Sequence, residues 1–189
     1  MKEGNFSSEV KDALKRIYIQ EKNTEVGFDE YIAILTKETY LKMLEDVRKS
    51  MISEESPSFV LNDMNGKPVS NTDLRGKVVI IDFWATWCEP CRVEMPALQA
   101  TYDAYQDQGL RILAINLGET RETASAWANT MRLTFDILLD PQQETAMLYQ
   151  LRGQPSTYVI APSGIITQIY YGATSEAALK AALAPYFRN

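Results

Sequence analysis

The chain has 189 residues, of which 46% are hydrophobic and 23% charged, and it carries a formal net charge of −6, 2 cysteines and no histidine. This length fits one domain, or one domain with an extension, and the acidic balance argues against nucleic acid or an anionic membrane surface as the main partner. Without histidine, the chain cannot build a Ser-His-Asp or Cys-His hydrolase, or a histidine-ligated metal or haem site. No apolar run reaches the roughly 18 residues that span a bilayer, and the amino terminus lacks a signal-peptide core, so we expect a soluble chain.

Residues 1–55 form a densely charged region that differs from the rest of the chain. Apolar residues recur at helical spacing over 10–17 and again over 28–51, with a break at 23–27, so two amphipathic helices are predicted. We expect a helical amino-terminal extension that packs on the main domain. The alternative is a hairpin that binds a partner or a second copy of the chain.

The second predicted region, residues 56–189, follows a polar, proline-containing linker at 53–58. Its expected strands are 59–63, 68–69, 78–84, 110–117, 135–139, 157–161 and 165–171, with a hairpin turn at Asn65-Gly66. Its expected helices are 90–108, 120–131, 141–151 and 175–187. This alternation predicts an α/β fold whose sheet is mostly parallel and covered by helices on both faces, with antiparallel strands added by the final hairpin.

Both cysteines lie in Cys88-Glu89-Pro90-Cys91, after a predicted buried strand and at the start of a predicted helix. Unpaired backbone N–H groups and the helix dipole stabilise a thiolate on Cys88, while Cys91, one turn further in, would resolve a mixed disulfide. Pro90 suits an early helical position. The charge of Glu89 is expected to raise the pKa of Cys88, which would make the couple reducing. Two thiols without histidine are a poor zinc site, so we expect no metal and no cofactor beyond the redox-active disulfide; the alternative is two buried cysteines that happen to lie three apart.

The segment from Asp82 to Cys91, Asp-Phe-Trp-Ala-Thr-Trp-Cys-Glu-Pro-Cys, resembles the active-site segment of thioredoxin-like proteins. It is most similar to the TlpA/ResA-like branch of thiol-disulfide oxidoreductases, which have an AhpC/TSA-Redoxin-like domain. Glu94 followed by Met95-Pro96, and an extra helix–strand segment between 117 and 151, strengthen this resemblance, which covers about residues 58–188. It implies a thioredoxin-like fold, with a central mixed sheet flanked by helices, and protein-disulfide reductase activity.

The resemblance also implies a substrate-binding face beside the cysteines. Pro155, after Gln154, is expected to be a cis proline that presents backbone to an extended substrate peptide, a strand-addition contact; the alternative is an ordinary trans proline. Trp87 is expected to be exposed and to shape the docking face together with Glu89 and Pro90, whereas Trp84 is expected in the core.

Two carboxyl groups compete for proton transfer to and from the cysteine pair. An acid at the position of Asp82 lies beneath the cysteines in thioredoxin-like proteins, where burial would raise its pKa. In the ResA-like branch that place is often not acidic, and a glutamate matching Glu94 is implicated instead. We favour Asp82 as the acid/base for Cys91 with Glu94 assisting; the alternative for Glu94 is a residue on a solvated helix face.

The leading expectation is a protein-disulfide reductase, with two alternatives left open. The resemblance implies protein thiol or disulfide substrates, apocytochrome c among the candidates, and a membrane thiol-disulfide electron donor. It also implies an extracytoplasmic or periplasmic location, with a membrane anchor that this chain lacks; the alternative is cytoplasmic. A thiol peroxidase of peroxiredoxin type is the second function, although Ala85 stands where that pattern needs Thr or Ser. The third is an assembly module that recruits a partner through residues 1–55.

Overall fold

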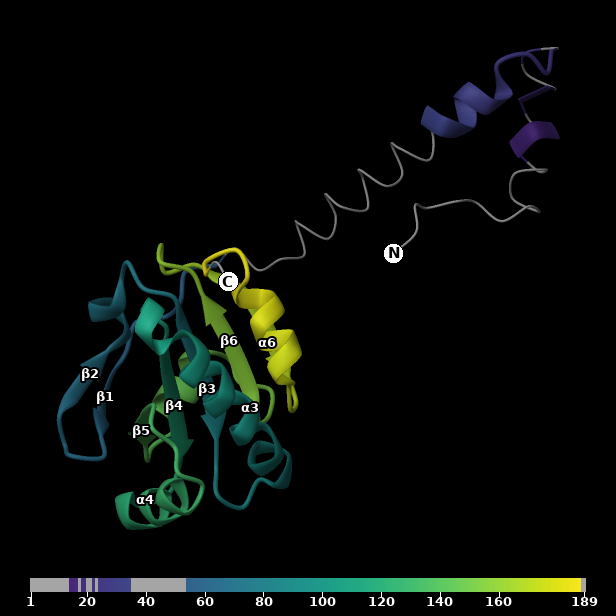
Figure 1. Ribbon diagram of the computed structural model, residues 1–189. Helices are drawn as coiled ribbons and strands as arrows, with labels where there is room; N and C mark the ends of the chain where they lie inside the picture. The colour runs from purple at the N-terminus through teal and green to yellow at the C-terminus, as the bar shows by residue number, and fades with distance from the viewer. Residues whose placement is uncertain (1–13, 17, 20–21, 23, 35–53, 188–189) are drawn as a thin grey trace. The chain divides into compact units, whose positions relative to one another are not determined.

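The computed structural model describes residues 14–16, 18–19, 22, 24–34 and 54–187 (Figure 1). Contacts within the chain divide it into two units, Met1–Met51 and Ile52–Asn189, and each is described by itself. The boundary predicted between residues 55 and 56 lies near this division and stays a prediction.

The described part of the first unit is helical around a small aromatic cluster. Residues 28–34 form a helix, and the Tyr18 ring lies 5.7 Å from the Phe28 ring and 5.0 Å from the Tyr31 ring. The Tyr18 hydroxyl donates to the Val26 carbonyl at 3.0 Å. Most of the two predicted helices, 10–17 and 28–51, lies outside the described residues, so the partner-binding hypothesis for this region stays open.

The second unit is built on a seven-stranded sheet with the order β2-β1-β5-β4-β3-β6-β7 (Figure 1). Its strands are β1 (Val60–Asp63), β2 (Pro68–Ser70), β3 (Val79–Trp84), β4 (Arg111–Leu117), β5 (Asp136–Asp140), β6 (Ser156–Ile160) and β7 (Ile166–Tyr171). β3, β4 and β5 are parallel to one another, and the other four pairings are antiparallel. The sheet is therefore mixed, which confirms the fold class.

The prediction of a mostly parallel sheet is wrong, and the connection between β5 and β6 explains why. The helix in that connection, α5 (Glu144–Leu148), has 5 residues, or about 7.5 Å of helix. A 5-residue strand is roughly 17 Å long. The chain therefore does not return along the length of β5. β6 starts at the same end of the sheet where β5 stops, and it runs antiparallel to its neighbour β3.

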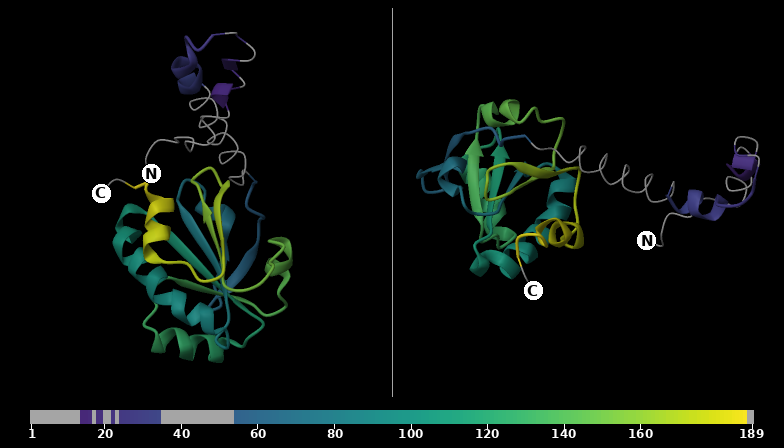
Figure 2. Two further views of the ribbon diagram at one scale, coloured as in Figure 1. Left: turned by 90° about the vertical axis from the view of Figure 1, so that its right-hand side faces the viewer. Right: turned by 90° about the horizontal axis from the view of Figure 1, so that it is seen from above.

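Two helical layers cover the sheet (Figure 2). The helices are η1 (Asn71–Leu74), α3 (Glu89–Tyr105), η2 (Gln106–Gln108), α4 (Arg121–Thr130), α5 and α6 (Glu176–Leu183). Side chains of α3, α4 and α6 share one hydrophobic cluster, and those of η1 and α5 share the cluster on the opposite face. Helices α5 and α6 are shorter than predicted. Left-handed backbone at Gln143 and Gln150 bounds the first. The second ends at Leu183, because Pro185 has no N–H with which to continue the helical hydrogen bonds.

The alternation of side chains along β3 decides which of them face the cysteine helix. All six residues of β3 are buried. Ile80 and Trp84 belong to the cluster that contains α3, whereas Val79, Ile81 and Phe83 belong to the opposite cluster. Because side chains alternate along a strand, Asp82 lies on the α3 side. The core position predicted for Trp84 is confirmed, since it is 0% exposed.

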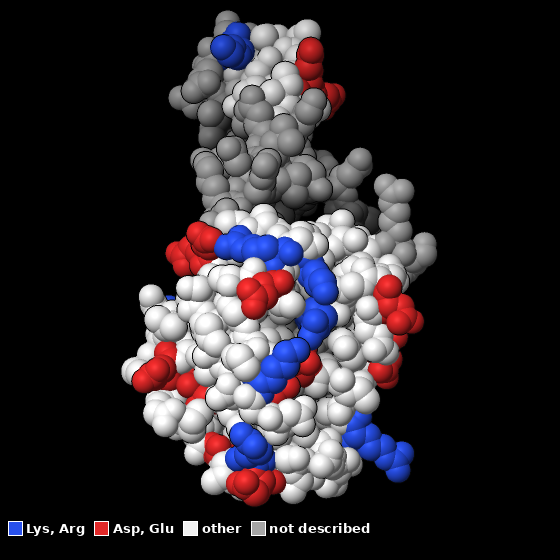
Figure 3. Space-filling view, turned by 90° about the vertical axis from the view of Figure 1, so that its left-hand side faces the viewer, with Lys and Arg blue, Asp and Glu red and all other residues white. Residues whose placement is uncertain are grey.

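Charged side chains of both signs lie on the face of the second unit drawn in Figure 3. A row of lysine and arginine side chains crosses this face with aspartate and glutamate beside it. Within the described residues, Arg75 pairs with Glu55 and Arg111 with Asp136. Such pairs neutralise basic charge locally. Nothing in the structure tests the expectation that nucleic acid is not a partner, so it stays a prediction. No helix in the described ranges is long and apolar enough to cross a membrane.

Candidate active site

The two cysteines form a disulfide at the amino-terminal end of α3. Cys88 is the residue that caps the helix, and its Sγ accepts the Cys91 backbone N–H at 3.2 Å. Cys88 is 4% exposed and Cys91 0%. In the reduced protein this N–H would stabilise a negative charge on the Cys88 sulfur. The arrangement can therefore activate the outer cysteine and keep the inner one shielded from substrate.

The residues between and beside the cysteines reach the surface. Pro90 stands in the first turn of α3, and Trp87 is 72% exposed. The Glu89 carboxylate is also exposed and pairs with the Arg92 guanidinium at 3.1 Å. The positive charge of Arg92 reduces the field that the Glu89 carboxylate exerts on Cys88. Arg92 therefore opposes the expected effect of Glu89 on the Cys88 pKa.

A carboxylate that sequence reasoning missed holds the loop before Cys88. Glu119 accepts hydrogen bonds from the Thr86 backbone N–H at 2.8 Å, the Thr86 hydroxyl at 2.5 Å and the Asn116 side-chain amide at 2.7 Å. Asn116 is the second-last residue of β4 and pairs with Trp84 of β3. Glu119 thus ties the loop to the end of β4. The one signal in the sequence was a polar Asn-x-x-Glu pair that begins at the end of a buried strand.

Gln154 and Pro155 lie at the same end of the sheet as the cysteine loop. The Gln154–Pro155 peptide bond is cis, which agrees with the expectation for this proline. Ser156, the next residue, pairs with Phe83 near the end of β3. The Pro155 carbonyl accepts the Gly172 N–H at 2.9 Å, and the Gln154 side-chain Nε2 is buried without a hydrogen-bond partner in the described structure.

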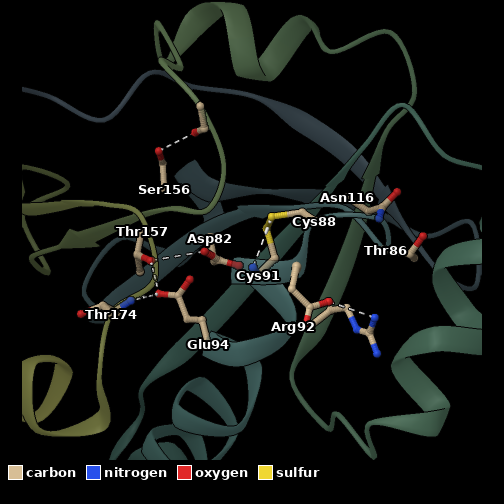
Figure 4. Close-up of a disulfide and its surroundings, with 12 residues drawn as sticks. Asp82, Thr86, Cys88, Cys91, Arg92, Glu94, Asn116, Ser156, Thr157 and Thr174 are labelled. Atoms are coloured by element: carbon tan, nitrogen blue, oxygen red, sulfur yellow. Dashed lines mark hydrogen bonds and ion pairs between the residues drawn. A yellow bond between two sulfur atoms is a disulfide. The ribbon is translucent and has the colours of Figure 1, made fainter.

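The two candidate acids meet at one hydroxyl group (Figure 4). The Thr157 Oγ1 lies 2.8 Å from Glu94 Oε1 and 3.3 Å from Asp82 Oδ1. Glu94 Oε1 also accepts the Thr174 backbone N–H at 3.2 Å. Asp82 is 0% and Glu94 1% exposed, so Glu94 does not lie on a solvated helix face. In Figure 4 the Asp82 side chain is drawn between Thr157 and Cys91.

Burial changes the acidity of both groups. It raises the pKa of Asp82 well above its ordinary range, with repulsion from the Glu94 charge adding to the effect. Burial also raises the pKa of Glu94 to about 7, against the opposing hydrogen bonds from Thr157 and Thr174. Within the described part of the chain, neither carboxyl group forms an ion pair. Two close carboxyl groups of this kind favour sharing one proton.

No group of three or more acidic or cysteine side chains within the described ranges could hold a metal ion. With its own residues the site can perform thiol–disulfide exchange. Cys88 and Cys91 supply the exchanging sulfurs, and Asp82 and Glu94 supply buried acids next to them.

Comparison with known proteins agrees with this chemistry. Residues 52–169 match the AhpC/TSA family. The thiol-disulfide oxidoreductase ResA of Geobacillus thermodenitrificans is 34% identical over 149 residues, which cover 79% of this chain and 86% of that protein. ResA of Bacillus subtilis is 35% identical over 130 residues, covering 68% and 73%. A candidate thiol:disulfide interchange protein DsbE from Chlorobium tepidum superimposes with a TM-score of 0.67 at 28% identity, covering 71% of this chain and 96% of that one.

Proposed function

The chain belongs to the AhpC/TSA family and is a thiol-disulfide oxidoreductase with a thioredoxin-like fold, and we propose that it reduces protein disulfides through Cys88 and Cys91. The observation that carries this proposal is the position of the pair at the start of α3, where Cys88 Sγ accepts the Cys91 N–H. That position favours a thiolate on the more exposed cysteine, and the thiolate is the nucleophile of disulfide exchange.

The reaction has two exchange steps. In the first, the Cys88 thiolate attacks one sulfur of the substrate disulfide, a Cys88–substrate bond forms, and the other substrate sulfur leaves as a thiolate. In the second, Cys91 loses its proton and attacks Cys88 Sγ, which releases the remaining substrate sulfur and forms the Cys88–Cys91 disulfide present in the structure. Two electrons pass from the enzyme to the substrate.

The neighbouring residues have distinct parts in the proposal. Trp87, Glu89 and Pro90 form the exposed border of the cysteine pair, and Gln154 and Pro155 lie at the same end of the sheet, where an extended peptide could add to the backbone. These five residues are proposed to contact the substrate.

Asp82 and Glu94 are proposed to handle the protons of the cysteine pair. The pKa of about 7 for Glu94 suits a group that exchanges protons near neutrality, because a general acid or base works best when its pKa is close to the operating pH.

The resemblance to TlpA/ResA-like proteins supports the remaining parts of the proposal. These are an extracytoplasmic location with membrane anchoring, protein thiol substrates with apocytochrome c among the candidates, and a membrane thiol-disulfide donor that re-reduces the pair. The reaction needs such a donor, since each turnover leaves Cys88 and Cys91 oxidised.

Turnover with a model protein disulfide tests the proposal. The reduced protein is expected to reduce insulin, and Cys91→Ser is expected to stop after the first step and retain substrate as a mixed disulfide. Cys88→Ser is the matched control, because it keeps one thiol of the pair and should retain no substrate. A reduction potential near thioredoxin's, about −270 mV, is expected; a value near −120 mV would indicate an oxidase instead. Peroxide consumption without disulfide reduction would favour the peroxidase.

A further inference from the structure

Three elements bring three side chains to one buried point. Asp82 comes from β3, Thr157 from β6 and Glu94 from α3. Asp82 and Thr157 are direct cross-strand partners, so their side chains lie on the same face of the sheet, the one that α3 covers. All three are at most 1% exposed, so water competes little for their hydrogen bonds.

The hydrogens available to this cluster allow a proton to be shared within it. A threonine hydroxyl has one hydrogen to donate, yet the Thr157 Oγ1 is within hydrogen-bonding distance of both Glu94 Oε1 and Asp82 Oδ1. The one hydrogen can be divided between the two oxygens, or it can go to the nearer one while the other carboxyl group, if protonated, donates to the Thr157 oxygen.

The distances indicate which carboxyl group holds the proton. Glu94 Oε1 has the shorter contact with Thr157, 2.8 Å against 3.3 Å, and accepts the Thr174 N–H as well. Two donors directed at one oxygen stabilise a carboxylate. Asp82 has no backbone donor in the described structure, so the geometry favours Asp82 as the protonated member, with its Oδ1–H donating to the Thr157 oxygen.

We propose that Thr157 is a proton-relay residue, which passes a proton from Asp82 to Glu94 when Cys91 is deprotonated. The proposal rests on the proposed function, because the deprotonation of Cys91 belongs to the second exchange step. It assigns Thr157 a role that acts through the two acids, and it makes Glu94 the final acceptor of the proton.

The transfer balances atom by atom. The Cys91 thiol proton moves to Asp82 Oδ2, an oxygen that is buried and has no hydrogen-bond partner in the described structure. The proton on Asp82 Oδ1 moves to the Thr157 oxygen, and the Thr157 hydroxyl proton moves to Glu94 Oε1. Asp82 and Thr157 each end with one proton, Glu94 becomes neutral, and Cys91 becomes a thiolate that attacks Cys88 Sγ. The single negative charge has moved from Glu94 to Cys91.

The acidities of the two groups agree with this order. Burial raises the pKa of Asp82 well above its ordinary range, which favours its protonated form, and a protonated Asp82 cannot accept a second proton without passing its own on. Glu94, with a pKa of about 7, can be charged before the step and neutral after it. Among the residues that the structure describes, the titratable group that acts on Asp82 is Glu94.

A two-phase reaction with dithionitrobenzoate tests the relay. Reduced Cys88 releases a first thionitrobenzoate and forms a mixed disulfide; Cys91 then attacks Cys88 Sγ and releases a second. Thr157→Val removes the hydroxyl and keeps the shape of the side chain. We expect the second phase to slow by about 100-fold and its pH profile to change, with the first phase unaffected. Thr157→Ser is expected to restore the second phase.

A matched control separates the relay from the loss of any buried hydroxyl. Thr101 is 0% exposed and its hydroxyl donates to the Ala97 carbonyl at 2.7 Å within α3. Thr101→Val is expected to leave both phases unchanged. If Thr157→Val does not fold, carboxyl carbon-13 NMR of the wild-type oxidised protein decides: Asp82 protonated at neutral pH with Glu94 titrating supports the relay, and an ionised Asp82 overturns it.

The outcomes distinguish the relay from the function on which it rests. A folded Thr157→Val whose second phase matches wild type in rate and pH profile overturns the relay, even if the wild-type protein reduces insulin. A wild-type protein that neither reduces insulin nor shows a second phase overturns the proposed function itself.

Discussion

Glu94→Gln should change how stability depends on pH, and the sign follows from the direction of the pKa. Burial raises the pKa of Glu94 from an ordinary 4.5 to about 7, so the folded state holds this proton more tightly than the unfolded state. The free energy of unfolding therefore falls as pH rises from about 4.5 to about 7 and then levels off. At about 1.4 kcal/mol for each pH unit, this costs about 3 kcal/mol, undiminished by solvent because Glu94 is 1% exposed.

Glutamine keeps an oxygen for the donors of Thr157 and Thr174 and cannot titrate. Urea denaturation of the oxidised protein at a series of pH values is expected to give a flatter curve for Glu94→Gln, by about 3 kcal/mol over this window. The slope is the measured quantity, because a buried amide nitrogen without a partner would lower stability at every pH by about 1–3 kcal/mol. Asp82 contributes a fall of the same sign in both proteins.

Glu122→Gln is the control for this experiment. Glu122 is exposed, and a hydrogen bond with its own backbone holds its pKa below the ordinary value, so it stabilises the fold at higher pH and its loss cannot flatten a fall with rising pH. Parallel curves for the wild type and Glu94→Gln between about pH 4.5 and pH 7 would refute the reasoning about the buried carboxyl pair.

Three further predictions concern groups around the site. Glu119→Ala removes two hydrogen bonds from Thr86 of the cysteine loop and one from Asn116 of β4, and it is expected to lower the free energy of unfolding by about 2–3 kcal/mol. Glu119→Gln should cost about 1 kcal/mol because the amide can keep most of these bonds; equal losses in urea denaturation would contradict this. Glu89→Gln is expected to lower the pKa of the first cysteine and Arg92→Ala to raise it, as measured by the pH dependence of alkylation; shifts of the same sign would be inconsistent with a charge effect. Tyr149→Phe removes the hydroxyl that contacts Ser56 at 2.6 Å and should cost about 1–2 kcal/mol in urea denaturation, and no loss would mean that water replaces the bond.

Local sequence patterns predicted the elements of the second unit because most of them depend on near neighbours. The buried run at 78–84 became β3, and the Asn65-Gly66 signal became the turn that joins β1 and β2, where Gly66 has φ of 81°. The direction of β6 could not be predicted this way. It depends on the length of α5, and the helical spacing over 141–151 overestimated that length because nothing local marks left-handed backbone at Gln143 and Gln150.

The sequence indicated site residues that lie close together in the chain better than contacts between distant residues. Cys88 and Cys91 are three residues apart, so their proximity follows from the sequence alone. Asp82 and Glu94 were indicated as separate candidates by the resemblance to thioredoxin-like and ResA-like proteins, and nothing in the sequence brought one acid to the other.

The contact between the acids depends on Thr157, which lies 75 residues after Asp82 and reaches it only through the register of β6 on β3. A threonine inside an apolar strand is an ordinary sequence feature, and nothing in its neighbourhood distinguishes it from Thr101. What distinguishes it is that two carboxyl groups approach one hydroxyl group. The division of work between Asp82 and Glu94, which the sequence left as a choice of one acid over the other, therefore becomes a question about a single proton shared through Thr157.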